Sequence, residues 1–240
     1  MNTIKIKKGK TKMIAHRGLS GLEKENTAVA FIAAGNRSYF GTECDIHLSK
    51  DNVFLVSHDG NTGRVAPVDK IIKECPAGEL QEICLYNDGP ESLTKNYLRI
   101  PTFEEYLFIS KKYDKHCVIE LKPEFTIFRI EVLIELLHKY DYLKKVTLIS
   151  FNYNNLATVR LVNKDITLQL LTSEPTPELL DKCVAIKADL DLNHTKATKE
   201  LIDDVHARGM KINVWTVNNP VLAEQYVEWG VDFITTNILE

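Results

Sequence analysis

The chain has 240 residues, 44% of them hydrophobic, a length that is typical of one large α/β barrel. Its 30 lysines and arginines are balanced by 33 aspartates and glutamates, which excludes the strongly basic surface of a nucleic-acid-binding protein, so no nucleic-acid partner is expected. No apolar run is long enough to cross a membrane, and none follows the N-terminal lysines as a signal peptide requires, so we expect a soluble, cytoplasmic protein with no membrane span.

Short β-rich runs alternate with amphipathic helical segments along most of the chain. In chain order, strands are predicted over residues 13–16, 41–48, 53–58, 116–122, 146–151, 167–172, 184–188, 211–217 and 232–235. Helices are predicted over residues 27–38, 102–113, 125–140, 153–162, 178–183, 196–208 and 220–229. Asn26 is a suitable N-cap for the first helix, and Gly209 follows the helix that ends near Arg208.

Two of the predicted strands, 41–48 and 53–58, are too close in sequence to be parallel neighbours, which need a longer crossover. We therefore predict an antiparallel hairpin with Lys50 and Asp51 as its loop, in which Glu43 lies opposite His58. The other eight strands, nearly all followed by helices, predict an α/β fold. The expected architecture is a TIM-type (β/α)8 barrel with a β-hairpin and a small insertion after the second barrel strand.

Residues 61–100 interrupt this alternation, because they are rich in glycine and proline and show little periodicity. Long irregular segments in compact proteins are usually functional loops, so we interpret this one as an insertion or lid above one end of the barrel. About 40 residues rarely sustain a separate core, so residues 1–240 are expected to form a single domain.

Five scattered cysteines, odd in number and without a CxxC pair, predict neither a zinc site nor a disulfide framework. Buried thiols in a reducing compartment are the simplest interpretation. The five are Cys44, Cys75, Cys84, Cys117 and Cys183.

Three carboxylates lie where the active site of such a barrel is found, at the C-terminal ends of its strands. Glu43 and Asp45 are two positions apart on one strand and therefore share a face, and Glu120 belongs to the next barrel strand. Oxygen ligands without nearby histidine or cysteine favour Mg²⁺ or Ca²⁺ over Zn²⁺. Exposed strand positions are the alternative interpretation, but the strand is expected to be buried.

Two histidines are placed to carry out acid–base chemistry. His16 ends the first strand, and the hairpin would bring His58 level with the carboxylates, although a slip of one residue would turn its side chain away. An imidazole titrates near neutral pH, so one ring can accept a proton while the other donates one. We prefer His58 as the base and His16 as the acid, with the reverse left open.

The remaining polar strand ends favour an anionic substrate. Arg17 offers a planar guanidinium and Lys122 an ammonium, and together with a metal they indicate a phosphate rather than a carbonyl or glycosidic substrate. Trp215, near the end of a late strand, is either a core residue or a wall beside an apolar part of the ligand. His47 shares the face of the carboxylates and is expected to lie beyond the metal.

Seven sequence elements in this order resemble the glycerophosphodiester phosphodiesterase family, over residues 13 to 237. They are His16-Arg17-Gly18, Glu25-Asn26-Thr27, Glu43-x-Asp45, His58-Asp59, Ile100-Pro101-Thr102, Glu120-x-Lys122 and Trp215-Thr216-Val217-Asn218. Two places depart from the family pattern, since Lys24 stands where proline is usual and Thr235-Thr236-Asn237 stands where Thr-Asp is common.

The resemblance implies a TIM-type barrel that hydrolyses glycerophosphodiesters to sn-glycerol 3-phosphate and an alcohol. It also implies a divalent cation at the positions of Glu43, Asp45 and Glu120, and acid–base roles for His16 and His58. In related barrels the neighbouring glycerol hydroxyl attacks the phosphate, and water then opens the cyclic product. The expected partner is a small-molecule glycerophosphodiester, and the sequence leaves the oligomeric state open.

Two alternatives remain at this point. A lysophospholipase D or a phosphoinositide-cleaving phosphodiesterase could use the same barrel. A non-catalytic phosphate-ligand binding protein could have kept the barrel without turnover, but the presence of both histidines and all three carboxylates argues against it.

Overall fold

Eight parallel strands close into a barrel in the computed structural model, which describes residues 2–86 and 97–240. Their hydrogen-bonded order is β1-β9-β8-β7-β6-β5-β4-β2, and pairing between β1 and β2 closes the ring. The strands are β1 (Lys12–Ala15), β2 (Gly41–Leu48), β4 (His116–Leu121), β5 (Val146–Ser150), β6 (Thr167–Thr172), β7 (Ala188–Asn193), β8 (Ile212–Trp215) and β9 (Phe233–Thr236). The predicted TIM-type fold is confirmed.

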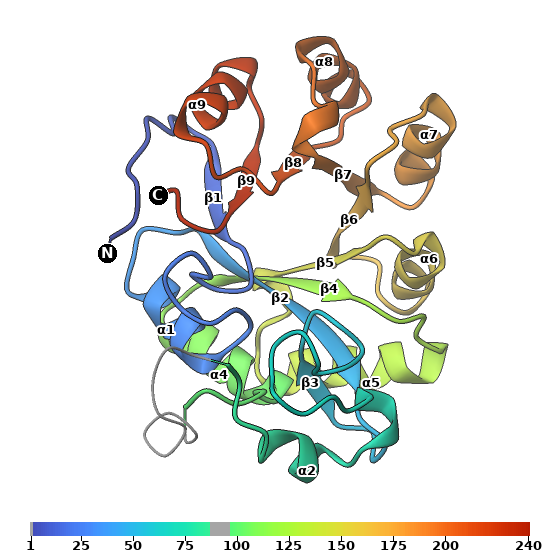
Figure 1. Ribbon diagram of the computed structural model, residues 1–240. Helices are drawn as coiled ribbons and strands as arrows, with labels where there is room; N and C mark the ends of the chain where they lie inside the picture. The colour runs from blue at the N-terminus through green and yellow to red at the C-terminus, as the bar shows by residue number, and fades with distance from the viewer. Residues whose placement is uncertain (1, 87–96) are drawn as a thin grey trace.

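Helices form an outer layer around the strands (Figure 1). They are α1 (Ala28–Gly35), α2 (Ala77–Gln81), α4 (Phe103–Lys112), α5 (Ile127–Lys139), α6 (Tyr153–Val162), α7 (Pro177–Ala185), α8 (Lys199–Ala207) and α9 (Pro220–Trp229). Short 3-10 turns are η1 (Ile72–Glu74), η2 (Leu143–Lys145) and η3 (His194–Lys196). No helix among the described residues is long and apolar enough to cross a membrane.

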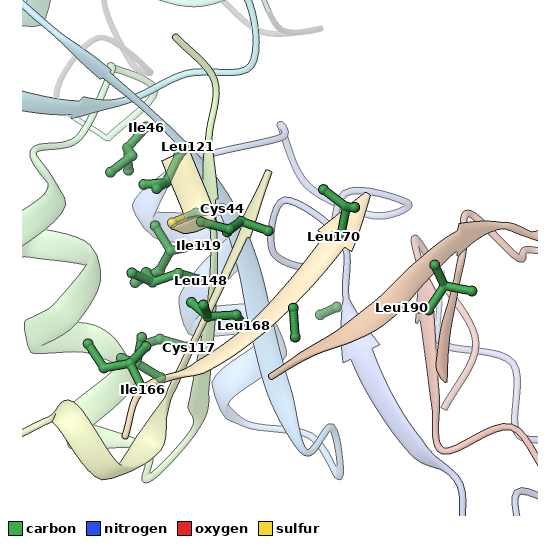
Figure 2. Close-up of a cluster of buried hydrophobic side chains, with 14 of the residues drawn as sticks. Cys44, Ile46, Cys117, Ile119, Leu121, Leu148, Ile166, Leu168, Leu170 and Leu190 are labelled. Atoms are coloured by element: carbon green, nitrogen blue, oxygen red, sulfur yellow. The ribbon is translucent and has the colours of Figure 1, made fainter. Parts of the chain in front are cut away.

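The main hydrophobic core lies between the strands and the helices. Figure 2 shows part of it, including Cys44 and Ile46 of β2, Ile119 of β4 and Leu148 of β5, all of which are completely buried. Because successive side chains of a strand point to opposite faces, the residues between these point into the barrel. In β2 and β4 the inward positions include Glu43, Asp45 and Glu120, so the fold itself directs these acidic residues to the barrel interior.

The hairpin is present, but its predicted register is wrong by one residue. Strand β3 (Phe54–Val56) is antiparallel to β2, with Ile46 opposite Val56 and Leu48 opposite Phe54. The loop is longer than predicted, since the Ser49 N–H donates to the Val53 carbonyl and Asn52 has a left-handed φ of 66°. One additional residue in the turn therefore shifts the pairing along the whole hairpin.

The strand predicted at 184–188 is also misplaced. Helix α7 continues to Ala185, Lys187 reverses the chain with a φ of 53°, and β7 runs over Ala188–Asn193. Leu190 and Leu192 of this strand pack in the core, whereas Asp191 between them is buried and lines the pocket inside the barrel. Every second residue of β7 is polar, a pattern that is typical of a half-exposed segment, and for that reason the sequence did not predict this strand.

The described part of the predicted insertion lies beside the hairpin, near β2 and β3 in Figure 1. Its buried apolar side chains form a second small core together with Leu55 of β3. That core consists of Leu55, Val65, Ala66, Ile72, Ala77, Leu80, Leu85, Leu98 and Ile100. Residues 87–96 of the predicted insertion lie outside the described residues.

The two ends of the described chain pair with each other. Ile4 forms a parallel bridge with Leu239, the Ile6 N–H donates to the Glu240 carbonyl, and Lys5 Nζ lies 2.8 Å from Glu240 Oε1. Strand β9 pairs with β1 over the whole length of both strands, which completes the barrel.

Candidate active site

A cluster of three carboxylates lies inside the barrel at the C-terminal ends of its strands. Glu43 and Asp45 come from β2 and Glu120 from β4, and the parallel register of these strands places Asp45 beside Glu120. One oxygen from each of the three lies within 4.8 Å of the others, and all three side chains are buried. Three converging carboxylate oxygens are a donor set that suits a hard divalent cation.

These acids strongly influence one another. Burial and the Asp45 charge raise the pKa of Glu43 well above its usual value, and the same causes raise the pKa of Glu120 to about 7. Burial also acts on Asp45, but the charges of Lys122 and Arg17 outweigh it and hold the Asp45 pKa below its usual value. The cluster therefore carries less negative charge at neutral pH than three carboxylates normally would, and a bound cation would favour its full ionisation.

Lys122 links the acidic cluster to His58. Its ammonium lies 3.0 Å from Glu120 Oε1 and 3.6 Å from Asp45 Oδ1, and it donates to His58 Nε2 at 3.1 Å. On the other side of the ring, His58 Nδ1–H donates to Asp59 Oδ1 at 2.7 Å. His58 thus reaches the carboxylates although the hairpin register differs from the prediction.

The reason lies in the end of the strand. Strand β3 stops at Val56, so the alternation of side chains that would have turned His58 away does not continue to it. The Ser57 N–H still donates to the Asp45 carbonyl at 3.0 Å, which keeps the departing chain against β2. The His47 ring donates from Nε2 to the His58 carbonyl at 3.2 Å, a further bond that holds this turn.

His16 follows β1 and is held by Asn237. The two side chains are joined by a 2.7 Å bond between His16 Nδ1 and Asn237 Oδ1, and Ser20 Oγ donates to the same oxygen at 3.1 Å. Because an amide oxygen only accepts, Nδ1 carries the ring proton and Nε2 keeps its lone pair. Burial, followed by the Arg17 charge, lowers the His16 pKa to about 4, so the ring is neutral at physiological pH.

Arg17 directly follows His16 and contacts the acidic residues, and its backbone has a φ of 53°. The backbone N–H of Arg17 donates to Glu43 Oε2 at 2.7 Å, and its side-chain Nη1 donates to Glu25 Oε1 at 2.9 Å. Its buried Nε lies 3.6 Å from Asp45 Oδ2 and has no hydrogen-bond partner among the described residues. The turn requires Gly18, where a Cβ would approach Ala30 to 2.7 Å.

Seven of the eight predicted site residues line one pocket, and Asp45 lies buried behind them. The seven are His16, Arg17, Glu43, His58, Glu120, Lys122 and Trp215. Trp215 donates from Nε1 to the Asp191 carbonyl at 3.2 Å and meets the Phe151 ring edge-on at 5.6 Å. These two aromatic rings give the pocket an apolar surface beside its charged residues, as expected for Trp215 if it contacts an apolar part of a ligand.

Sequence reasoning missed or misassigned other residues at the site. Asn26 is not the helix cap, because Thr27 caps α1, while Asn26 has a φ of 55° and donates from Nδ2 to Asp45 Oδ2 at 2.8 Å. Asp191 lines the pocket, and burial and the Glu120 charge raise its pKa to about 8. Asn26 belongs to the Glu25-Asn26-Thr27 element, which was the available signal; Asp191 had none once β7 was misplaced.

Comparisons with known proteins agree with this geometry. The model of the Glycerophosphoryl diester phosphodiesterase family matches residues 16–240. The protein YhdW of Bacillus subtilis (strain 168) is 30% identical over 94% of this chain and 93% of its own length. A glycerophosphodiester phosphodiesterase of Caldanaerobacter subterraneus subsp. tengcongensis is 28% identical over 95% of this chain and 94% of its own.

A solved structure shares the fold. The Oleispira antarctica phosphodiesterase, determined in complex with its product sn-glycerol-3-phosphate, has a TM-score of 0.85 to this chain at 24% identity. The match covers 94% of this chain and 92% of the other. At this identity the similarity concerns the barrel fold.

Proposed function

Because the chain belongs to the glycerophosphoryl diester phosphodiesterase family, and is thus a phosphoric diester hydrolase, we propose that it hydrolyses glycerophosphodiesters to sn-glycerol 3-phosphate and an alcohol. One observation carries the proposal: three buried carboxylates, with oxygens within 4.8 Å of one another, lie in a site that also contains two histidines and the basic side chains of Arg17 and Lys122. Release of sn-glycerol 3-phosphate from such a diester, before and after removal of divalent cations, tests it.

Glu43, Asp45 and Glu120 are proposed to hold Mg²⁺ or Ca²⁺, since their oxygens converge and no softer ligand belongs to the cluster. When bound, the cation would supply Lewis-acid stabilisation of negative charge on the phosphate. The guanidinium of Arg17 and the ammonium of Lys122, which line the same pocket, are proposed to bind phosphate oxygens. Trp215 would contact the apolar part of the substrate.

The two histidines differ in a way that supports distinct roles. His16 is neutral, with Nε2 free to accept a proton, so it suits removal of the proton from the attacking hydroxyl. The His58 ring is oriented by its Nδ1–H bond to the Asp59 carboxylate, and we assign to it the transfer of a proton to the leaving alcohol. This assignment reverses the preference drawn from the sequence. In the second step, when water opens the cyclic phosphate, the roles of the two rings exchange.

The insertion is proposed to form one domain with the barrel, because its apolar core includes Leu55 of β3. None of the five cysteines, all of which are described, forms a disulfide, and four are buried. Such thiols suit a reducing compartment, so a cytoplasmic location is proposed.

Metal affinity is expected to depend on pH around neutrality. Glu120 has a pKa of about 7 and must lose its proton to act as a ligand. The apparent affinity for Mg²⁺ or Ca²⁺ should therefore weaken by about tenfold for each pH unit below that pKa, if one proton is displaced. Calorimetric titrations on either side of this pKa measure the effect, and an affinity that does not change with pH would contradict it.

The Asn237→Asp substitution is expected to move the pH dependence of catalysis. A carboxylate opposite Nδ1 favours the protonated ring, so the pKa of His16 should rise from about 4, by roughly 1 to 3 pH units. Since the proposed base must be neutral, the acid limb of the kcat/KM profile should shift to higher pH at saturating metal. Asn237→Ala is the control without an added charge. An unmoved limb in Asn237→Asp would exclude His16 as the base.

A further inference from the structure

One arginine of the insertion joins two carboxylates beside the active site. Arg64 Nε lies 2.5 Å from Asp59 Oδ2, while its Nη1 and Nη2 donate to Glu25 Oε2 at 3.0 Å and Glu25 Oε1 at 2.7 Å. Glu25 belongs to the loop before α1, and Asp59 follows β3. Arg64 is only 5 positions from Asp59 but 39 from Glu25, so one planar guanidinium links the segment after β3 to the loop before α1.

Each of these carboxylates also holds a residue of the proposed catalytic site. Glu25 Oε1 accepts from Arg17 Nη1 at 2.9 Å, and Asp59 Oδ1 accepts from His58 Nδ1 at 2.7 Å. Arg64 is therefore connected to Arg17 through Glu25 and to His58 through Asp59, with one carboxylate between the guanidinium and each of these site residues. Its own guanidinium contacts neither of them in the bonds that the structure records.

Charge supports the ordering of this network. Burial alone would raise the pKa of Glu25, but the hydrogen bonds and charges of Arg64 and Arg17 hold it below its usual value. The same opposition holds for Asp59, whose pKa is lowered by its bonds to His58 and Arg64. Both acids are therefore ionised and engaged on two sides, unlike an isolated surface ion pair, which contributes little.

The backbone around Arg64 is well fixed. Thr62 is fully buried, its carbonyl accepts from the Val65 and Ala66 N–H groups, and its hydroxyl donates to the Val68 carbonyl. Val65 and Ala66 pack in the second core beside β3. Arg64 is thus presented by a closed turn between buried residues, so its guanidinium approaches the two acids from a stable position.

We propose that Arg64 is a positioning residue that fixes Arg17 and His58 relative to each other, through Glu25 and Asp59. The proposal rests on the roles given to Arg17 and His58 above. It gives the insertion a direct part in the reaction, because the phosphate contact and the proton donor then keep one geometry. An arginine is required, since an ammonium cannot hold two carboxylates in the same plane.

Kinetics of single variants test the proposal. Arg64→Ala is expected to lower kcat/KM by about 10- to 100-fold, the range for removal of groups that orient active-site ligands. Glu25→Gln should mainly raise KM, because it releases Arg17, and Asp59→Asn should mainly lower kcat, because it releases His58. Arg64→Ala should change both constants, and Arg64→Lys should restore only part of the loss.

Arg99→Ala is the matched control. Arg99 also lies in the predicted insertion and forms a bidentate pair, with Glu105 of α4, but this pair is outside the site. The Arg99→Ala variant should leave kcat and KM unchanged, and its Tm shows how much the loss of such an ion pair lowers stability. Parental kcat and KM in Arg64→Ala, or a loss equal to that of Arg99→Ala, would overturn the proposal.

A combined variant tests the route of the effect. In a Glu25→Gln/Asp59→Asn background, Arg64→Ala should cause no further loss, because both of its partners are already neutral. A further loss as large as in the parent would show that Arg64 acts by another route. Crystal structures of the parent and of Arg64→Ala test the positioning role independently of the proposed function. The Arg17 and His58 side chains should be displaced in Arg64→Ala even if the parent cleaves no glycerophosphodiester. Unchanged positions of both side chains would contradict the positioning role.

Discussion

Replacement of His58 by alanine is expected to lower kcat by about 100- to 10,000-fold, the usual contribution of a general acid or base. The ring is held between Asp59 and Lys122, at 2.7 and 3.1 Å, and is proposed to donate the proton that the leaving alcohol needs. The same loss is expected for His16→Ala. Steady-state rates at saturating metal and substrate measure both variants.

His206→Ala is a matched control for this prediction. His206 also forms a pair with a carboxylate, 2.9 Å from Asp232 Oδ2, but it lies at the end of α8, outside the pocket. Its loss should leave kcat near the parental value. If His16→Ala and His58→Ala both retain near-parental turnover while they remain folded, acid–base catalysis by these two residues is wrong.

Glu43→Gln is expected to weaken binding of the divalent cation, so that both activity and stability respond much less to added metal. One of the three proposed carboxylate ligands is lost, so the metal concentration for half-maximal activity should rise by more than about 100-fold. Loss of a residue that only hydrogen-bonds to a ligand typically costs about 10- to 100-fold, and loss of the ligand itself should cost more. Glutamine keeps an oxygen that can accept from the Arg17 N–H, so the local turn should persist. Activity and Tm, each measured across a metal titration, follow the two effects.

The sign of the stability change distinguishes this variant from a misfolded one. Burial raises the Glu43 pKa above its usual value, so ionising this group in the folded protein costs stability as the pH rises above that usual value. Removing the acid should therefore leave the Tm in EDTA at alkaline pH equal to or higher than that of the parent. Added Mg²⁺ or Ca²⁺ should raise the parental Tm and not that of the variant. A metal-dependent rise of equal size in Glu43→Gln would contradict the assigned site.

The barrel and its acidic cluster could be predicted because both depend on local rules. Strands with a period of two place Glu43 and Asp45 on one face, and parallel strand ends of a barrel meet at one rim, which brings Glu120 to them. Helices with clear amphipathic patterns were also placed well, and α6 and α9 have the predicted bounds.

The errors arose where the barrel interior is polar or where a turn sets a register. In strand β7, Asp189 and Asp191 alternate with Leu190 and Leu192, a pattern that in an isolated sequence indicates a half-exposed segment. In the hairpin, the count of loop residues depends on the left-handed Asn52, and nothing in the sequence required that conformation there. The placement of His58 succeeded because β3 ends early, and the predicted pairing was not its cause.

The hydrogen-bond network around the site could not be derived from the sequence. Arg64 and Glu25 are 39 positions apart, and Asn237 meets His16 across 221 positions. Such pairings depend on how loops from different strands converge above the barrel, which no local pattern encodes. Asn237 lies in the Thr235-Thr236-Asn237 segment, where the sequence departs from the family pattern, but that departure did not predict its contact with His16.

The release of sn-glycerol 3-phosphate from glycerophosphocholine tests the proposed function most directly. Protein treated with EDTA should release none, and addition of Mg²⁺ or Ca²⁺ should restore release, because the three buried carboxylates are proposed to hold the cation that the reaction requires. Glu43→Gln, assayed in parallel, should show no comparable restoration. Release that persists unchanged in EDTA, or its absence from the parent at saturating metal, would contradict the account.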